Sequence, residues 1–383
     1  MRRLQNLGFV LNASCNLRCA YCYRQGASAG QMAWPVLRRR LRGLLPACVA
    51  DVECAFTGGE PLLSMPLIRR AVEEGEMLAA KSGRRFRWKL LTNGLLLDSE
   101  ALDFLDAHRF AVNLSFDGVE TSQDARGRGT FRRLDALVDR MAREYPDLWE
   151  DRLQISMTLT PDNLPQFRDS VRYFLGKDVR NLAVSPAMGR AGCEWRSDRI
   201  AELDAQVGGV STLLRRVVKK TGMSPLSLFR KTGESGPSPY PDWLCLAYQM
   251  RSLTVDVDGR CYGCVLATSS YRRRSNHPLG PAVAALEIGP VGAAGLPRRR
   301  AATARAIRAA EVFQHPGRRA STYRRCADCP HLGHCQVCPI AAATQPGWSD
   351  PRRVPDFLCA FNQVVLTHRE TFPAQPDPLG AWA

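Results

Sequence analysis

The feature that most constrains the fold is an alternation of short apolar runs with longer amphipathic patterns over the first half of the chain. The runs predict buried strands, and the patterns between them predict helices. Strands that alternate with helices in this way build a parallel sheet. In a parallel barrel the chemistry lies at the carboxyl ends of the strands, so the residues after each run are candidates for a functional site. The predicted strands cover residues 6–11, 52–56, 88–91, 111–116, 153–159 and 182–185.

The predicted helices begin with typical start signals. Asp98 and Thr130 stand at the start of two periodic stretches and are expected to be N-caps, because such side chains accept hydrogen bonds from free amides of the first turn. The predicted helices cover residues 33–46, 65–81, 98–107, 130–144, 163–174 and a stretch after Gly192.

The chain is long enough for more than one domain, since 383 residues exceed the usual single-domain size of about 100 to 200. Residues 236–241 are rich in proline and other turn formers, which is typical of a linker. We expect a first domain at 1–215, a linker at 216–242, a small cysteine-rich domain at 243–365 and a disordered tail at 366–383.

Three cysteines follow the first predicted strand with the spacing C-x3-C-x2-C, namely Cys15, Cys19 and Cys22. Thiolates this close in sequence can hold only one compact cofactor. Tetrahedral zinc would need a fourth ligand nearby, and residues 23–38 contain neither Cys nor His. An iron–sulfur cluster held by three cysteines leaves one iron open to a small molecule. The alternative is three thiols packed as small hydrophobic groups.

With Tyr21, this spacing resembles the C-x3-C-x-aromatic-C signature of the radical SAM superfamily. The resemblance implies a 4Fe-4S cluster whose open iron binds S-adenosylmethionine (SAM). It implies that reductive cleavage of SAM gives a 5'-deoxyadenosyl radical, which abstracts hydrogen from a substrate. It also implies an α/β fold with a partial (β/α)6 TIM-like barrel, which agrees with the six predicted strands.

Two further motifs follow the second and third predicted strands. Gly58, Gly59 and Glu60 begin a Gly-Gly-Glu-Pro sequence that resembles the family's GGEP motif, whose residues bind the SAM amino group. The alternative is an ordinary turn. Thr92-Asn93-Gly94 resembles the family's TNG turn, and its alternative is a plain Asn-Gly turn.

The fourth predicted strand leads into an S-x-D-G sequence with Ser115 and Asp117, followed by Gln123 and Arg126. The run resembles the family's S-x-D-G and H-D-x-x-R sequences, with Gln123 in place of the usual His. Ser115 is a candidate contact for the SAM ribose or methionyl carboxylate, whereas Asp117 and Arg126 could equally form a structural ion pair. Ser156 on the fifth strand is a candidate for the adenosyl pocket, although such polar side chains are often simply hydrogen-bonded within the fold.

Eight cysteines return in the C-terminal half, in a pattern that resembles the SPASM domain. The resemblance implies two auxiliary 4Fe-4S clusters. The first would be held by Cys245, Cys264 and Cys338, with Cys261 as fourth ligand, although the spacing before Cys338 is one residue shorter than in the family. The second would be held by Cys326, Cys329, Cys335 and Cys359.

Zinc is the alternative for these cysteines, because their spacing also resembles a zinc ribbon or knuckle. His331 and His334 lie within the same stretch and enlarge the set of candidate ligands.

Composition narrows the classes of partner. The formal net charge is +16, which favours contact with nucleic acid, an anionic membrane or an acidic peptide. The excess lies in arginine runs without interleaved aromatic residues, so a solvated surface is favoured over a nucleic-acid site. No apolar run reaches the ~18 residues of a membrane span, and tightly grouped cysteines favour a reducing cytoplasm over disulfides. We therefore expect a soluble, cytoplasmic protein.

The resemblance implies a radical SAM/SPASM enzyme, a family dominated by maturases of peptides and proteins. The leading hypothesis is oxidative crosslinking of a ribosomally made precursor peptide. The alternatives are an anaerobic sulfatase-type formylglycine maturase, a dehydrogenase or epimerase of a small metabolite, and a non-catalytic metal protein that binds nucleic acid. Sulfatase maturases use an Asp base near the substrate; Val265, which follows Cys264, cannot serve, and no catalytic residue is assigned.

Two partners are expected besides the substrate. A flavodoxin or ferredoxin would supply the electron, by resemblance to the family. Only 14 residues precede Cys15, so leader recognition would need a separate protein or the basic surface.

Overall fold

The structure is a computed structural model. It describes residues 3–22, 24, 30–187, 195, 197–230, 247, 251–271, 283–284, 286–290, 296, 301, 320–321, 325–332, 334–335, 337–338, 353–373 and 375. Cys245 and the proline-rich stretch 236–241 lie outside these residues.

The chain divides into two compact units, and each is described by itself. The first comprises Met1–Arg18, Cys22–Leu114 and Leu244–Gln314. The second comprises Cys19–Tyr21, Ser115–Trp243 and His315–Ala383. This division differs from the expected succession of domains, because segments from both ends of the chain contribute to each unit.

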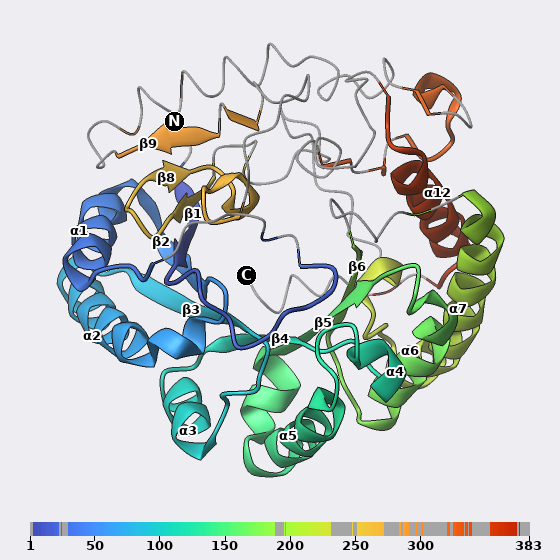
Figure 1. Ribbon diagram of the computed structural model, residues 1–383, viewed down its shortest axis with the longest axis horizontal. Coiled ribbons are helices and arrows are strands. Elements are labelled where there is room, and N and C mark those ends of the chain that lie inside the picture. The colour runs from blue at the N-terminus through green and yellow to red at the C-terminus, as the bar shows by residue number, and fades with distance from the viewer. Residues whose placement is uncertain are drawn as a thin grey trace. The chain divides into compact units, whose positions relative to one another are not determined.

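The first unit is built on a mainly parallel sheet. Strands β1 (Leu4–Val10), β2 (Cys48–Thr57), β3 (Arg85–Thr92) and β4 (Ala111–Ser115) pair in this order, each parallel to the next. Helices α1 (Trp34–Leu44), α2 (Met65–Ser82) and α3 (Ser99–Ala107) lie outside these strands (Figure 1). At Gly75 of α2 an added Cβ would lie 2.5 Å from the Trp88 ring, so glycine lets this helix approach β3 closely.

Three more strands extend this sheet beyond β1, and the sequence analysis did not predict them. Strand β7 (Ser252–Val255) runs parallel to β1, while β8 (Cys261–Tyr262) and β9 (Glu287–Gly289) follow in antiparallel pairing. Asp258-Gly259 forms the turn between β7 and β8, with φ +82° at Gly259. The segment expected to open the separate cysteine-rich domain therefore belongs to the same sheet as β1.

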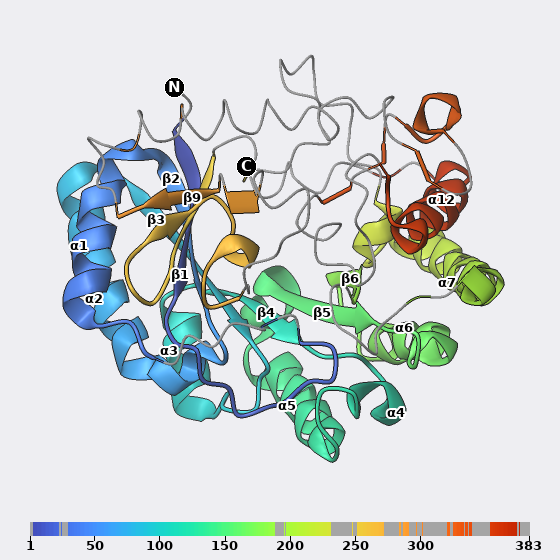
Figure 2. The ribbon, with the colours of Figure 1, turned by 45° about the horizontal axis from the view of Figure 1, so that its top comes forward.

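The second unit contains the parallel pair β5 (Leu153–Leu159) and β6 (Leu182–Pro186). Its helices are α4 (Glu120–Gln123), α5 (Thr130–Glu144), α6 (Phe167–Gly176), α7 (Ile200–Thr221) and α12 (Asp356–Glu370). Helices α7 and α12 lie side by side in both views (Figures 1 and 2), and His368 of α12 contacts the Asp204 carboxylate of α7 at 2.9 Å.

Short helical turns complete the described elements. They are η1 (Leu45–Ala47), η2 (Pro61–Ser64), η3 (Leu148–Arg152), η4 (Leu164–Gln166), η5 (Ser197–Arg199), η6 (Ser227–Phe229), η7 (Val265–Ala267) and η9 (Cys326–Asp328).

All six predicted strands are confirmed, and 153–159 matches β5 without adjustment. The prediction for Asp98 is also confirmed, because its side chain accepts a hydrogen bond from the Ala101 amide at 2.8 Å. The prediction that Thr130 caps a helix is wrong. Gly129 is the residue before α5, and the Thr130 hydroxyl instead donates to the Gly127 carbonyl at 2.6 Å.

The chain also departs from the expected linker and tail. Helix α7 continues to Thr221, past the boundary placed at 215, and α12 continues to Glu370. Phe372 is buried and lies 4.9 Å from the Phe229 ring, so the expected disordered tail is folded through this residue. No helix among the described residues has the length and apolar character needed to cross a lipid bilayer.

Candidate cofactor sites

The predicted cluster cysteines follow strand β1. Cys15 is exposed, Cys19 and Cys22 are half-buried, and none of the three forms a disulfide. The Leu17 amide and the Asn93 side-chain amide contact the Cys15 sulfur at 3.4 and 3.8 Å. Such N–H groups stabilise a thiolate, which is the form that binds iron.

The glycine pair after β2 leaves room for the backbone segment that precedes Cys15. The Gly59 amide donates to the Asn12 carbonyl at 3.0 Å, and the Glu60 amide donates to the Ser14 carbonyl at 2.8 Å. An added Cβ on Gly59 would lie 1.9 Å from the Ser14 oxygen, and one on Gly58 would lie 2.6 Å from the Asn12 oxygen. The two glycines therefore allow a close approach of the chain's own backbone at residues 12–14.

Glu60 is completely buried, and its carboxylate joins two of the predicted motifs. It accepts hydrogen bonds from the Thr92 hydroxyl at 2.7 Å, the Asn93 amide at 2.8 Å and the Leu62 amide at 3.1 Å. Burial raises the pKa of Glu60, while these three donors oppose the rise. The side chain thus fixes the TNG turn against the GGEP turn, and its predicted contact with SAM stays a prediction.

Asn12 is a residue of this site that no motif indicated. Its side-chain amide donates to the Glu60 carbonyl at 3.0 Å and to the Ser64 hydroxyl at 2.8 Å. Its Oδ1 atom is buried and accepts no hydrogen bond from the described part of the chain. A buried acceptor without a donor is costly, so this atom beside Gly58 fits a ligand that brings an N–H group, such as the amino group of SAM.

Tyr271 reaches the same motif from the segment after β8. Its hydroxyl donates to the Gly58 carbonyl at 2.8 Å and lies 3.0 Å from the Thr57 hydroxyl. Burial raises the pKa of Tyr271 to about 12, although the Thr57 hydrogen bond opposes the rise. No sequence pattern indicated this residue, because a lone tyrosine more than 200 positions away carries no spacing that relates it to the glycine pair.

In the second unit, Tyr21 of the cysteine signature contacts the S-x-D-G loop. Its hydroxyl donates to Asp117, and its ring lies under the Arg126 guanidinium at 5.3 Å. Burial raises the pKa of Tyr21 well above its ordinary value. The ring is 5% exposed, and its polar atom is already bonded, so its predicted contact with the cofactor stays a prediction.

Asp117 and Arg126 form the ion pair that the sequence left as one alternative. Their side chains are 0% and 8% exposed, and the two charged groups lie 2.8 Å apart. Asp117 also accepts from the Thr158 amide at 2.8 Å, while Arg126 donates to the Ser156 carbonyl at 3.1 Å. Burial lowers the pKa of Arg126, but the facing Asp117 carboxylate outweighs it and raises that pKa above its usual range.

Gln123 occupies the position where the family has His, and it is completely buried. Its Oε1 accepts from the Asp117 amide at 3.0 Å, and its Nε2 donates to the Thr130 hydroxyl at 3.0 Å. An acceptor and a donor on opposite ends of the side chain are what a neutral imidazole would also supply. Gln123 therefore supports the loop through both ends of its amide.

The predicted SAM contacts on the strands are half-buried. Ser115 ends β4 and Ser156 lies in β5. The Ser156 carbonyl accepts from the Phe116 amide at 3.1 Å and from Arg126, which is a structural role of its backbone. The contacts of both hydroxyl groups with SAM stay predictions.

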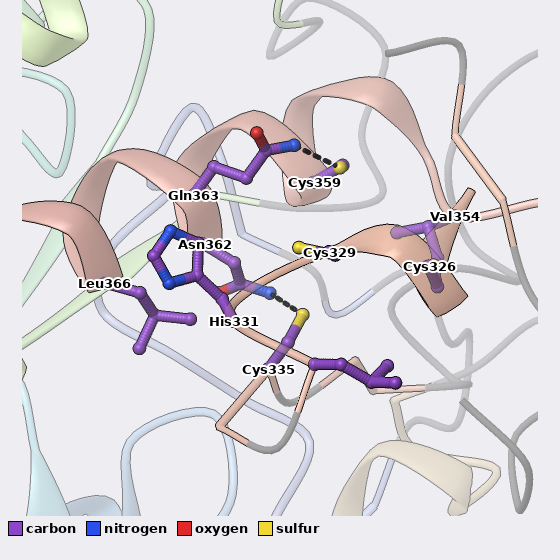
Figure 3. A pocket seen from close by; sticks show the side chains of 10 residues that line it. Cys326, Cys329, His331, Cys335, Val354, Cys359, Asn362, Gln363 and Leu366 are labelled. Carbon is purple, nitrogen blue, oxygen red and sulfur yellow. Dashed lines mark hydrogen bonds between the residues drawn. The ribbon is translucent and has the colours of Figure 1, made fainter. Parts of the chain in front are cut away.

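Four of the C-terminal cysteines line one pocket in the second unit (Figure 3). They are Cys326, Cys329, Cys335 and Cys359, which are the four assigned to the second auxiliary cluster. Leu332, Val354 and Leu366 form apolar walls of this four-cysteine pocket. The donor set and the apolar surroundings fit a thiolate-bound cluster.

Helix α12 supplies polar groups to the same pocket. Gln363 Nε2 donates to the Cys359 sulfur at 2.9 Å, and Asn362 Nδ2 donates to the Cys335 sulfur at 3.4 Å (Figure 3). Cys359 also lies 3.1 Å from the Ser321 hydroxyl. The sequence analysis did not find these residues, although positions 359, 362, 363 and 366 follow the helical spacing of one face.

His331 is not placed as a ligand, although it lies between two of these cysteines in sequence. Its Nδ1 lies 2.8 Å from the Glu370 carboxylate, and its Nε2 lies 3.1 Å from the Thr367 hydroxyl. Both ring nitrogens are engaged by α12, so the side chain attaches the cysteine loop to this helix.

The remaining predicted ligands lie elsewhere. Cys261 is completely buried in β8 of the first unit, and Cys264 is half-buried just after it. Cys338 is half-buried in the second unit, and Cys245 is outside the described residues. The ligand set of the first auxiliary cluster therefore stays a prediction.

Comparison with known proteins concerns the family and the fold. Residues 10–174 match the model of the radical SAM superfamily. A cysteine-type anaerobic sulfatase-maturating enzyme of Clostridium perfringens (strain 13 / Type A) is 28% identical over 184 residues, which are 45% of this chain and 48% of that protein. The chain spans about half the length of the curated relatives that it matches.

Two solved structures share the fold over almost the whole chain. Native anSMEcpe with bound AdoMet and Kp18Cys peptide has a TM-score of 0.72 and 17% identity, covering 95% of this chain and 96% of that one. Streptococcus suis SuiB bound to precursor peptide SuiA has a TM-score of 0.59 and 13% identity, covering 94% and 76%.

Residues 10–174 therefore resemble a radical SAM domain, and the expected α/β fold with a mostly parallel, barrel-like sheet is confirmed. Proteins of this superfamily use a 4Fe-4S cluster and SAM.

Proposed function

We propose that this chain is a radical SAM enzyme that oxidatively crosslinks a ribosomally made peptide. A 4Fe-4S cluster held by Cys15, Cys19 and Cys22 would supply an electron to SAM and so generate the radical that abstracts hydrogen from the peptide. The likeness in fold to SuiB, which was solved with a precursor peptide, supports a peptide substrate. A flavodoxin-type or ferredoxin-type protein would deliver the electron, and the cytoplasm is the compartment in which such grouped thiolates persist.

The observation that carries the proposal is the four-cysteine pocket. A second cysteine site besides the triplet of the radical SAM domain distinguishes enzymes with auxiliary clusters from simpler relatives. Within the described part of the chain, no three Cys, His, Asp or Glu side chains are grouped closely enough to hold a single metal ion. Four thiols in one pocket with apolar walls are a donor set that an iron–sulfur cluster uses, and zinc is the alternative that the metal count below decides.

Residues of the first unit would prepare the SAM site. Gly58 and Gly59 keep the chain before Cys15 close to the end of β2. Asn12 presents a buried acceptor there for the SAM amino group, and Tyr271 orients the Gly58 carbonyl. Each of these groups is held by internal hydrogen bonds, which lowers the cost of ordering the site when SAM binds.

A formylglycine-forming sulfatase maturase is the second candidate, because the Clostridium perfringens relative is named for that activity. That reaction needs a base near the substrate cysteine or serine. Val265 follows Cys264 here, and the nearby Asp256 carboxylate is completely buried and bonded to the Ser269 hydroxyl at 2.6 Å. Neither residue supplies an exposed carboxylate for that base, so we place the maturase second.

The experiment is anaerobic reconstitution with iron and sulfide. Iron and zinc are counted per chain, and 5'-deoxyadenosine is measured after SAM and dithionite are added. The wild type is expected to cleave SAM. Cys19→Ala should abolish cleavage while auxiliary iron is retained, and Cys329→Ala should lose iron, retain cleavage and form no modified peptide. Cleavage by the Cys19→Ala variant would show that the central assignment is wrong.

The substrate class is decided by mass spectrometry of two peptides. One is a short precursor encoded beside the enzyme's gene, and the other is a sulfatase peptide with a central cysteine. A loss of two hydrogens in the first peptide supports crosslinking. Formylglycine in the second supports the maturase, and turnover of neither would favour a small metabolite as substrate.

A further inference from the structure

Two side-chain amides in the four-cysteine pocket direct N–H groups at cysteine sulfurs. This arrangement gives them a role besides lining the pocket. Gln363 and Asn362 each direct an amide N–H group at the sulfur of a different cysteine (Figure 3). Both residues lie on α12, the same helix that carries Cys359, so their positions relative to the sulfurs are set by a rigid element.

A second set of contacts joins the cysteine loop to α12. His331, which is 6% exposed, bonds through both ring nitrogens to Thr367 and Glu370 on the next turns of α12. The loop that carries Cys329 and Cys335 is therefore attached to the helix that carries the donors. Gln363 and Asn362 are half-buried, so water competes with them only partly.

We propose that Gln363 and Asn362 raise the reduction potential of the cluster in this pocket. This inference rests on the proposed function, because it requires that the four cysteines bind iron and sulfide. An N–H donor stabilises negative charge on a thiolate sulfur, and the reduced cluster carries one more negative charge than the oxidised one. The donors therefore stabilise the reduced state more than the oxidised state. A higher potential suits a site that receives the electron left over when a peptide is oxidised.

The two contacts differ in length, which predicts an order of effects. Gln363 lies 2.9 Å from its sulfur, whereas Asn362 lies 3.4 Å from its own. Gln363→Leu removes the N–H group at similar volume and should change the one-electron equilibrium about tenfold, which corresponds to a potential lower by about 59 mV. Asn362→Leu should lower the potential by less. Gln363→Glu replaces the donor with a negative charge, and it should lower the potential at least as much as Gln363→Leu.

The test uses the full reconstituted chain in a background with Cys15, Cys19 and Cys22 changed to alanine, so that the SAM-binding cluster is absent. Reduction is followed by electron paramagnetic resonance during a potentiometric titration. The signal of the pocket is the one that Cys329→Ala removes. Thr367→Val is the matched control, since it removes a polar contact of α12 that reaches His331 and no sulfur.

A lower potential in both Gln363 variants, with iron content unchanged and Thr367→Val at the wild-type potential, supports the inference. An unchanged potential in the Gln363 variants with full iron overturns it and leaves the proposed cluster intact. An equal shift in Thr367→Val also overturns it, because the cause would then be helix packing. If Cys329→Ala removes no iron, the pocket holds no cluster, and both the inference and this part of the proposed function fail.

Discussion

Replacing Arg126 with methionine tests the buried ion pair on which the S-x-D-G loop depends. The variant keeps the length of the side chain and its apolar stem but leaves the Asp117 carboxylate, which is 0% exposed, without its cation. The hydrogen bond from Arg126 to the Ser156 carbonyl is lost as well. Breaking a buried pair by removing one partner costs about 3–5 kcal/mol of the free energy of unfolding.

An exposed pair on the same unit provides the matched control. Arg172 and Asp169 lie 2.6 Å apart, with side chains that are 56% and 51% exposed. Such a pair contributes about 0–1 kcal/mol. Arg172→Met therefore makes the same chemical change at a site where water compensates for it.

The measurement is urea unfolding of the chain, followed by circular dichroism, with equal slopes required before the free energies of unfolding are compared. Arg126→Met should be less stable than Arg172→Met by about 2–5 kcal/mol. Adding Asp117→Asn to Arg126→Met should recover part of the loss, because no buried charge then remains. If the two single variants lose the same free energy, the argument from burial is refuted.

Three other variants test the first unit. Gly59→Ala should prevent SAM cleavage, because its Cβ would lie 1.9 Å from the Ser14 oxygen. Gly43→Ala is the control and should cleave SAM normally, because an added Cβ there meets nothing within 4 Å. The assay for both variants is 5'-deoxyadenosine formation. Tyr271→Phe should raise the KM for SAM about threefold to tenfold, with a smaller change in kcat. The reason is the loss of one hydrogen bond to the Gly58 carbonyl, which contributes about 0.5–1.5 kcal/mol. An unchanged KM would contradict a positioning role for Tyr271. Glu60 has a raised pKa, so its contribution to stability is present below its ordinary value of 4.5 and is lost as the pH rises through the raised value. Glu60→Gln should remove this loss of stability at higher pH. The measurement is the free energy of unfolding in urea from pH 4 to 8. If the variant shows the same pH dependence as the wild type, the raised pKa of Glu60 is contradicted.

The strands were predictable because their residues alternate between buried and half-buried positions, which gives short, largely apolar runs whose ends are visible in the sequence. Strand β7 was missed because it has only four residues, Ser252–Val255, and because its partner β1 lies some 240 residues earlier. The Asp258-Gly259 turn is a hairpin signal that was available in the sequence. It would have predicted the pairing of β7 with β8, but not the place of β7 beside β1.

The four cysteines of the second auxiliary cluster were predictable from the sequence, but the residues that surround them were not. Spacing put Cys326, Cys329, Cys335 and Cys359 together, and the four do line one pocket. Spacing could not tell that His331 is bonded through both nitrogens to α12, since that depends on where a helix some 35 residues later packs. The histidine resembled a ligand in the sequence, and it is a structural contact in the fold.

The same distinction applies to the SAM motifs, and it shows which residue to examine next. Resemblance assigns Glu60 and Tyr21 to the cofactor, yet both bond within the fold, so a ligand would gain little from atoms already satisfied. Asn12 carries no motif, but its buried Oδ1 lacks a donor among the described residues. An unsatisfied buried acceptor is a stable feature only when something else supplies the hydrogen bond. The motif residues therefore support the loops, their contacts with SAM stay predictions, and Asn12 is the residue to test next as an acceptor for a ligand's N–H group.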